Sequence, residues 1–160
     1  MCRYCQQVSS AIFGKDWMLL VSFANLPASL FRVSSVLNRD SKQFGKKHLF
    51  DGHEETCWNS DQGAIQWVLL EFPQMVKISE VRLQFQGGFA STDCRLEGCT
   101  KNEDMFTKLA NFYPEDKNSL QSFPIHGDPL AHKLKIVFEN STDFFGRIIV
   151  YKLDVLGEKL

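Results

Sequence analysis

The feature that most constrains the fold is an alternating run, VKISEVRLQFQGG, at residues 76–88. Polar and apolar residues take strict turns from 81 to 86, and successive side chains of a β-strand point to opposite faces of its sheet. The period slips by one residue near Glu80, which predicts a β-bulge. Gly87 and Gly88 end the run, so the pattern predicts a strand with one buried face.

Similar runs recur along most of the chain and are separated by turns rich in Gly, Pro, Asn and Asp. Pro73 is expected to end the first of them. Long helical periods are absent, which is typical of a β-sandwich or barrel. The further strands are expected at 66–72, 132–140 and 146–157, with weaker candidates at 93–99, 106–113 and 120–125.

The chain has 160 residues, of which 44% are hydrophobic, and this suits one domain with a packed core. Residues 1–31 differ in texture from the rest and are expected to form an N-terminal extension to a domain at 32–160. The apolar run at 17–31 contains Asn25 and Pro27 and is too short for a transmembrane helix. No membrane association is therefore expected.

Charge argues against direct binding to nucleic acid. The formal net charge is −1 and both signs are scattered, so no basic stripe offers a phosphate-binding surface. Five cysteines form no even-numbered disulfide framework, which favours a reducing compartment.

Two segments carry a resemblance to a known fold family. LFDGHEETCWNSDQGAIQWVLLEF at 49–72 resembles the opening of discoidin domains, also called coagulation-factor type C or galactose-binding-like domains. FFGRIIVYKLDVLGEKL at 144–160 is similar to their closing strand. The resemblance covers about 32–160 and implies an all-β fold, an eight-stranded jelly-roll β-sandwich with a short N-terminal extension.

A narrower resemblance is carried by RVSSVLN, QFGKKHLFD, EETCWNSDQG, FYPEDKNSLQSFPI and TDFFGR. These segments resemble a family of small nuclear-receptor-associated proteins. The resemblance implies a monomeric, non-enzymatic protein of the nucleus, and also of the cytoplasm. Its implied partner is a nuclear receptor of the testicular orphan type, whose binding to DNA response elements it would reduce. The chain has no LxxLL helix, so receptor binding is expected to use loops on a folded surface.

The cluster FDGHEETCWNS at 50–60 has two interpretations. In discoidin-like domains the corresponding loop often turns around calcium, which implies Asp51 and Thr56 as ligands. The usual closing acid corresponds to Lys152, which would repel a cation, and Asp154 is a shifted alternative. We favour the other interpretation, in which Asp51 and Thr56 hydrogen-bond backbone amides and shape the turn. No cofactor is then expected.

In this second interpretation Trp58 is a buried structural anchor packed against Trp67. Neither a transition-metal site nor a catalytic site is expected at His53 and Cys57, because no third partner is signalled.

Loop aromatics are the candidates for protein contact. In QGGFAS, at 86–91, Phe89 lies at an expected loop tip with Arg95 nearby, and it either projects as a spike or folds back under the loop. In TDFFGR, Phe144 and Phe145 are adjacent, and neighbouring residues of a strand face opposite sides. Exposed clusters of this kind make good interface anchors.

Three functions fit these observations. The first is the receptor-binding repressor. The second is a lectin-like domain that binds sugar or lipid, and the third is a calcium-stabilised adaptor subunit of a larger assembly. Calcium would raise the melting temperature in the third case.

Overall fold

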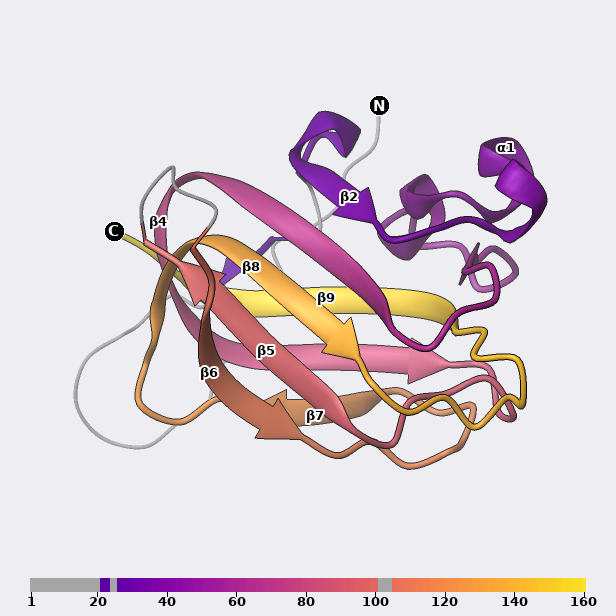
Figure 1. Ribbon diagram of the computed structural model, residues 1–160. Helices are drawn as coiled ribbons and strands as arrows, with labels where there is room; N and C mark the ends of the chain where they lie inside the picture. The colour runs from indigo at the N-terminus through magenta and orange to yellow at the C-terminus, as the bar shows by residue number, and fades with distance from the viewer. Residues whose placement is uncertain (1–20, 24–25, 101–104) are drawn as a thin grey trace.

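The computed structural model describes residues 21–23, 26–100 and 105–160, and strands dominate it (Figure 1). Its hydrogen-bonded order is β1-β9-β4-β8-β5-β6, with β2 and β7 also paired to β4 and β3 paired to β9. The strands are β1 (Val21–Ser22), β2 (Phe31–Val33), β3 (Trp58–Asn59), β4 (Gln66–Phe85), β5 (Cys94–Cys99), β6 (Thr107–Phe112), β7 (Gln121–Pro124), β8 (Leu130–Phe138) and β9 (Ile149–Lys159). The short helices are the 3₁₀ helices η1 (Ala28–Leu30), η2 (Leu37–Arg39) and η3 (Lys46–Leu49) and the α-helix α1 (Ser41–Phe44).

The predicted all-β sandwich is confirmed. Every pairing between these strands is antiparallel. Within the described part of the chain, strands β2 to β9 supply the eight strands of the expected domain, and β1 adds a ninth.

The long strand β4 belongs to both layers of the sandwich. Its first part, Gln66–Glu71, pairs with β8, and its last part pairs with β7 and β9. The register with β8 shifts between Glu71 and Val76, at the point where β4 passes from one layer to the other. A single bent strand therefore joins the two sheets into one continuous ladder.

The prediction that Pro73 ends a strand is wrong, because β4 continues through it. Pro73 lies inside the register shift and is exposed, so its missing N–H interrupts no regular ladder. The predicted slip near Glu80 is confirmed, because the pairing of β4 with β9 shifts between Ile78 and Glu80.

Trp58 belongs to the core and is 0% exposed. Its ring centroid is 6.1 Å from that of Phe138, which in turn is 5.8 Å from Phe85. The indole Nε1–H donates to the Ser35 carbonyl at 2.9 Å, so the one polar atom of the ring is satisfied. The ring neighbour is therefore Phe138 in place of the expected Trp67.

Trp67 has the opposite orientation because adjacent positions of a strand alternate between faces. Val68 on β4 is fully buried in the core, whereas Trp67 is only half-buried. The Lys135 ammonium lies 5.1 Å from the Trp67 ring centroid, which indicates a cation–π contact on the outer face of the sheet.

Most of the expected extension, residues 1–31, lies outside the described residues. Ser22 pairs with Leu156 on β9, and the Phe23 N–H donates to the Val155 carbonyl at 2.9 Å. Phe23 is buried, and its ring centroid is 4.9 Å from that of Phe72. Among the described residues, no helix has the length and apolar character needed to cross a membrane.

Replacing Trp58 with alanine is expected to lower the free energy of unfolding by about 3–5 kcal/mol, because it leaves a large cavity. Trp58→Phe should cost about 1–3 kcal/mol, because it keeps a ring and leaves the Ser35 carbonyl unpaired. Urea denaturation measures both, with Tyr113→Ala as a control at a side chain that is 65% exposed. A Trp58→Ala protein as stable as the wild type would contradict the burial of this ring in the core.

Candidate functional site

Three loops meet at one end of the sandwich: 60–65 before β4, 86–93 between β4 and β5, and 139–148 between β8 and β9 (Figure 1). The Ser60 N–H donates to the Ile148 carbonyl at 2.9 Å, and the Ile148 N–H donates to Ser60 Oγ at 2.8 Å. We call the outer side of these three loops the loop surface. The Thr142 N–H donates to the Ala90 carbonyl at 2.8 Å, which joins the second loop to the third, so the three loops form one unit.

At Gly63 and Gly146 two of these loops lie backbone against backbone. The Gly63 N–H donates to the Phe145 carbonyl at 3.1 Å. Gly146 has a φ of +82°, and a Cβ atom there would lie 2.0 Å from the Gly63 carbonyl oxygen. Only glycine fits both the left-handed backbone and the missing space.

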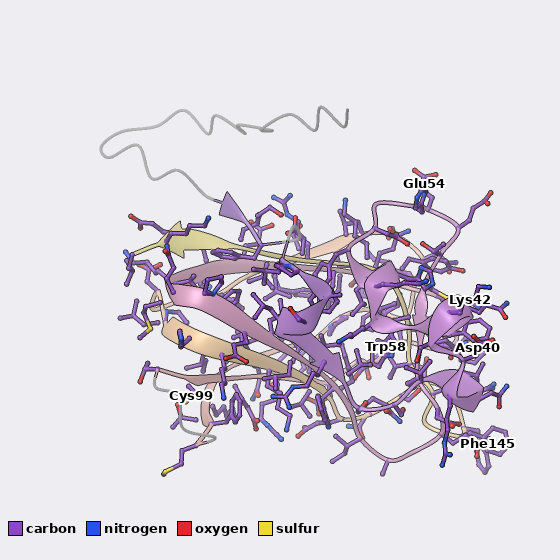
Figure 2. The ribbon with its side chains drawn as sticks, turned by 90° about the horizontal axis from the view of Figure 1, so that it is seen from above. Asp40, Lys42, Glu54, Trp58, Cys99 and Phe145 are labelled. Atoms are coloured by element: carbon purple, nitrogen blue, oxygen red, sulfur yellow. The ribbon has the colours of Figure 1, made fainter. Side chains whose placement is uncertain are left out.

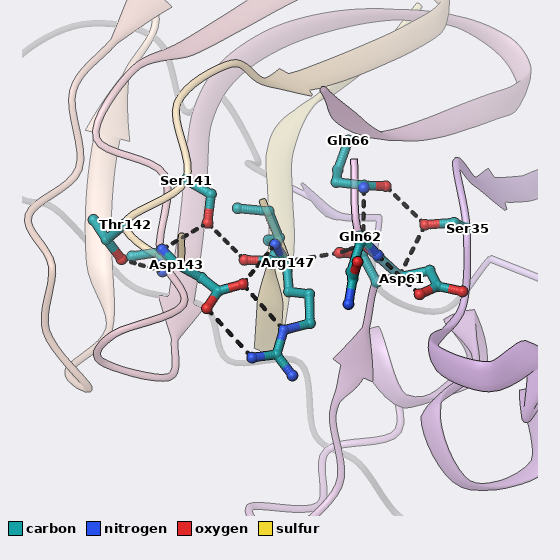
Figure 3. Close-up of polar contacts among 11 residues, drawn as sticks. Ser35, Asp61, Gln62, Gln66, Ser141, Thr142, Asp143 and Arg147 are labelled. Atoms are coloured by element: carbon teal, nitrogen blue, oxygen red, sulfur yellow. Dashed lines mark hydrogen bonds and ion pairs between the residues drawn. The ribbon is translucent and has the colours of Figure 1, made fainter. Parts of the chain in front are cut away.

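The turn at 141–147 is closed by its own polar side chains (Figure 3). Ser141 Oγ accepts from the Asp143 N–H at 3.0 Å and donates to the Arg147 carbonyl at 2.7 Å. The Asp143 carboxylate accepts from the Arg147 N–H at 3.1 Å and from the guanidinium Nε and Nη2 at 3.0 and 3.3 Å. These bonds fix the turn that carries Phe144 and Phe145.

Asp143 remains ionised because of its partner. The side-chain bond from Arg147 holds the pKa of Asp143 below its ordinary value and outweighs the opposing effect of burial. The same bond raises the pKa of Arg147. The ion pair therefore persists throughout the physiological pH range.

The loop at 60–65 is held from its other side by serines near β2 (Figure 3). Gln66 Oε1 accepts from Ser34 Oγ at 2.6 Å and from Ser35 Oγ at 2.8 Å. Gln66 Nε2 donates to the Asp61 carbonyl at 2.9 Å, and Ser35 Oγ accepts from the Asp61 N–H at 3.0 Å. Sequence reasoning missed this network, because its partners are about 30 residues apart and no local pattern links them.

The predicted aromatic residues come together on this frame. Phe144 is 94% exposed and Phe145 54% exposed, and their ring centroids are 5.3 Å apart at 89°. Figure 2 shows Phe145 at the outer rim of this end of the molecule. Phe89 is half-buried under Arg147, whose guanidinium carbon lies 5.0 Å from its ring centroid. Sequence reasoning missed Arg147, although it directly follows the Phe-Phe-Gly turn.

A shallow hollow of about 520 Å³ opens beside the two phenylalanines. Arg95, the other predicted contact residue, reaches it indirectly, since its guanidinium pairs with Glu139 on the wall of the hollow and with Glu97. The lining includes Gln62, Glu139, Asn140, Asp143, Phe144 and Phe145.

The Asp51 turn is organised by donors from the protein itself. Asp51 Oδ2 accepts from the Thr56 hydroxyl at 2.6 Å and lies 2.9 Å from His48 Nδ1, and Oδ1 accepts from the His53 N–H at 2.9 Å. Partial burial pushes the pKa of Asp51 upward, but the bonds from Thr56, His48 and His53 together hold it below its ordinary value. Asp51 thus bonds a backbone amide as expected, whereas the Thr56 hydroxyl donates to the Asp51 carboxylate in place of the expected backbone amide.

The structure places Asp154, the third candidate calcium ligand, in another environment. Its carboxylate accepts from the Ser22 hydroxyl at 2.6 Å, and burial raises its pKa. Thus Asp154 turns toward β1, while Asp51 bonds within its own turn. No group of three or more His, Cys, Asp or Glu side chains suited to a metal ion occurs in the described part of the chain.

Cys57, before β3, and Cys94, at the start of β5, both have thiols with raised pKa values. Burial raises the pKa of the Cys57 thiol, and it raises the pKa of Cys94 to about 12. Because the thiolate is the reactive form, both side chains are inert thiols at neutral pH.

The Asp143–Arg147 pair makes the stability of the turn depend on pH. An aspartate with a lowered pKa stabilises the fold above its unfolded-state value of about 3.9, and this contribution is lost as the pH falls through the folded-state pKa. Asp143→Asn should therefore lower the melting temperature at pH 7, and the gap to the wild type should narrow below about pH 4. Glu115→Gln, at an exposed carboxylate, is the control. A gap that stayed constant with pH would contradict the assignment.

Calcium is expected to leave the melting temperature unchanged relative to a chelator. Both oxygens of Asp51 already accept protein donors, so a cation would first have to displace Thr56 and His53. Thermal melting of the wild type and of Asp51→Asn, each with calcium and with a chelator, gives the four melting temperatures to compare. A calcium-dependent rise in the wild type that is lost in Asp51→Asn would instead establish the calcium site.

A family model and several named relatives match most of this chain. The model of the Sad1/UNC-like C-terminal family matches residues 32–159. The nuclear receptor 2C2-associated protein of Danio rerio is 75% identical over 128 residues, which cover 80% of this chain and 90% of the relative. The protein of the same name from Homo sapiens is 58% identical over 136 residues, which cover 84% and 95%.

Solved structures of other proteins share the fold of this chain. An F5/8 type C domain from Bacteroides fragilis matches with a TM-score of 0.70 at 13% identity, over 84% of this chain and 96% of that chain. A family 32 carbohydrate-binding module from Clostridium perfringens, solved with galactose, matches with a TM-score of 0.65 at 16% identity, over 79% and 91%. These likenesses confirm the predicted discoidin-like sandwich. By its family match and its relatives, the chain belongs to the Sad1/UNC-like C-terminal family and, within it, to the nuclear receptor 2C2-associated proteins.

Proposed function

We propose that this chain is a non-catalytic interaction module that binds a nuclear receptor through the loop surface. Relatives named for association with nuclear receptor 2C2, at up to 75% identity, support a receptor of that type as the partner. In this proposal the complex forms in the nucleus and lowers the occupancy of DNA response elements by the receptor.

The observation that carries the proposal is the exposed pair Phe144 and Phe145. Phe144 leaves 94% of its surface in water, although a buried phenylalanine side chain is worth roughly 1.5–3 kcal/mol. Aromatic anchors of this kind supply much of the energy of protein interfaces when a partner covers them. The pair therefore fits a contact site better than it fits any role in the fold.

The rigidity of the turn supports the same use. Arg147, Asp143 and Ser141 close it with side-chain bonds, and the main chain of Gly63 in the neighbouring loop bonds to it. An anchor that is already fixed loses little conformational entropy when it binds. The site thus resembles a preorganised binding loop on a rigid scaffold.

The charge of the chain favours an effect on DNA through the receptor. The net charge is −1 and the sequence pI is about 6.4, so the chain has little electrostatic attraction for the DNA backbone. A repressor of this charge acts more readily by occupying or reorienting the receptor than by competing for response elements.

The test is the affinity of the purified full chain for nuclear receptor 2C2. Phe144→Ala and Phe145→Ala should each weaken binding about tenfold or more, which is about 1.4 kcal/mol, because each removes an apolar contact. Met105→Ala is the matched control, since Met105 is 76% exposed and precedes β6 at the opposite end of the sandwich. The melting temperature of each variant shows whether it remains folded.

Titration of the receptor on a labelled response element gives the second readout. The wild-type chain should displace the receptor from the DNA, and Phe144→Ala should require a higher concentration to do so. Absence of binding by the wild type would remove the receptor as partner. If both phenylalanine variants bind with wild-type affinity, the loop surface is not the binding site.

A further inference from the structure

The side chain of Arg147 lies between two aromatic rings of the loop surface. Its guanidinium carbon is 5.0 Å from the ring centroid of Phe89 and 5.9 Å from that of Phe145. A planar guanidinium stacks well on aromatic faces, and such stacking fixes its orientation. The charge is therefore held at a defined place beside the ring of Phe145, which in turn contacts the exposed ring of Phe144.

Some N–H donors of Arg147 have no acceptor among the described residues. Guanidinium carries five N–H donors. Nε and Nη2 bond to Asp143, whereas Nη1 makes no hydrogen bond to any described residue. In Figure 3 one guanidinium nitrogen has no dashed line and lies on the side away from Asp143. The Arg147 side chain is 30% exposed and that of Asp143 only 11%. The guanidinium is therefore more accessible to a partner than the carboxylate.

The nearby carboxylates are already occupied. Asp143 accepts from the backbone and the guanidinium of Arg147, and Glu139 pairs with Arg95. The part of the loop surface around the phenylalanines thus offers apolar rings and free N–H donors. Its carboxylates already accept from arginines, and Arg95 is shared between Glu139 and Glu97. A partner lysine or arginine placed there would meet the like charge of Arg147, which is unfavourable.

This inference rests on the proposed function and specifies the chemistry of the partner. We propose that the receptor segment on the loop surface carries an aspartate or glutamate next to an apolar side chain. The carboxylate accepts from the free N–H groups of Arg147, and the apolar side chain covers Phe144. Charge-assisted bonds to an arginine are strong and directional, and a guanidinium already oriented by Asp143 and two rings loses little freedom on binding.

The experiment measures the dissociation constant of the full chain and nuclear receptor 2C2 at about 50 and 300 mM salt, because added salt screens exposed charges. The variants are Phe144→Ala, Arg147→Met and Arg147→Lys. Arg32→Met is the matched control at an exposed arginine on β2. Arg147→Met keeps the Ser141–Arg147 and Asp143–Arg147 bonds that use the backbone, and melting and hydrogen exchange at 141–147 check the turn.

Arg147→Met should bind about tenfold more weakly at low salt and should lose much of the wild-type dependence on salt. The affinity of Arg147→Lys should fall between those of the wild type and Arg147→Met, because lysine keeps the charge and loses the planar pair of donors. Phe144→Ala should bind weakly but keep the salt dependence, and Arg32→Met should match the wild type. A purely structural role of Arg147 would lower affinity without changing the salt dependence.

The outcomes separate the two proposals. In one outcome, Phe144→Ala weakens binding while Arg147→Met keeps both the affinity and the salt dependence of the wild type. That result would overturn the proposed receptor carboxylate and leave the receptor-binding function standing. If Arg147→Met loses affinity but keeps the wild-type salt dependence, the carboxylate is likewise overturned. If the wild type does not bind the receptor, the proposed function itself fails.

Discussion

The backbone of Gly63 lies against Gly146, and this contact determines where the exposed aromatic residues are. A Cβ atom on Gly146 would lie 2.0 Å from the Gly63 carbonyl oxygen, so no side chain fits between the two loops. The Gly63 N–H also donates to the Phe145 carbonyl. With the backbone fixed on its inner side, the side chain of Phe144 is left in solvent. The candidate site is thus a consequence of two loops packed at main-chain distance.

The rest of the fold supplies the rigidity that this contact needs. β4 passes through both layers and ties them into one ladder, and Trp58 fills the core beneath the loops, with its indole bonded to Ser35. Ser35 also accepts from the Asp61 N–H, so the same segment anchors the core and the first loop. Arg147 does the corresponding work on the third loop, where it closes the turn through Asp143 and packs on Phe89. A few residues therefore both anchor the core and support the loop surface.

Local sequence patterns predicted the parts of this account that depend on neighbours in the chain. The strand at 76–88, its slip near Glu80 and the all-β class follow from alternation and turn residues, whose physical basis is local. Pro73 misled, because whether a proline ends a strand depends on where the ladder shifts register between distant strands. Phe144 and Phe145 were identifiable as an unusual adjacent pair, but the stacking of Arg147 on Phe89 joins positions 58 residues apart by their numbers and leaves no trace in the sequence.

In the proposed function, the partner binds at the loop surface. Hydrogen–deuterium exchange of the full chain, alone and saturated with nuclear receptor 2C2, tests it most directly because it maps protection along the backbone. Binding at the loop surface should slow exchange at 60–65, 86–93 and 139–148 in the complex and leave it unchanged at Cys99 and Leu130, at the opposite end. Protection confined to that opposite end, or to the outer face of the sheet around Trp67, would contradict it.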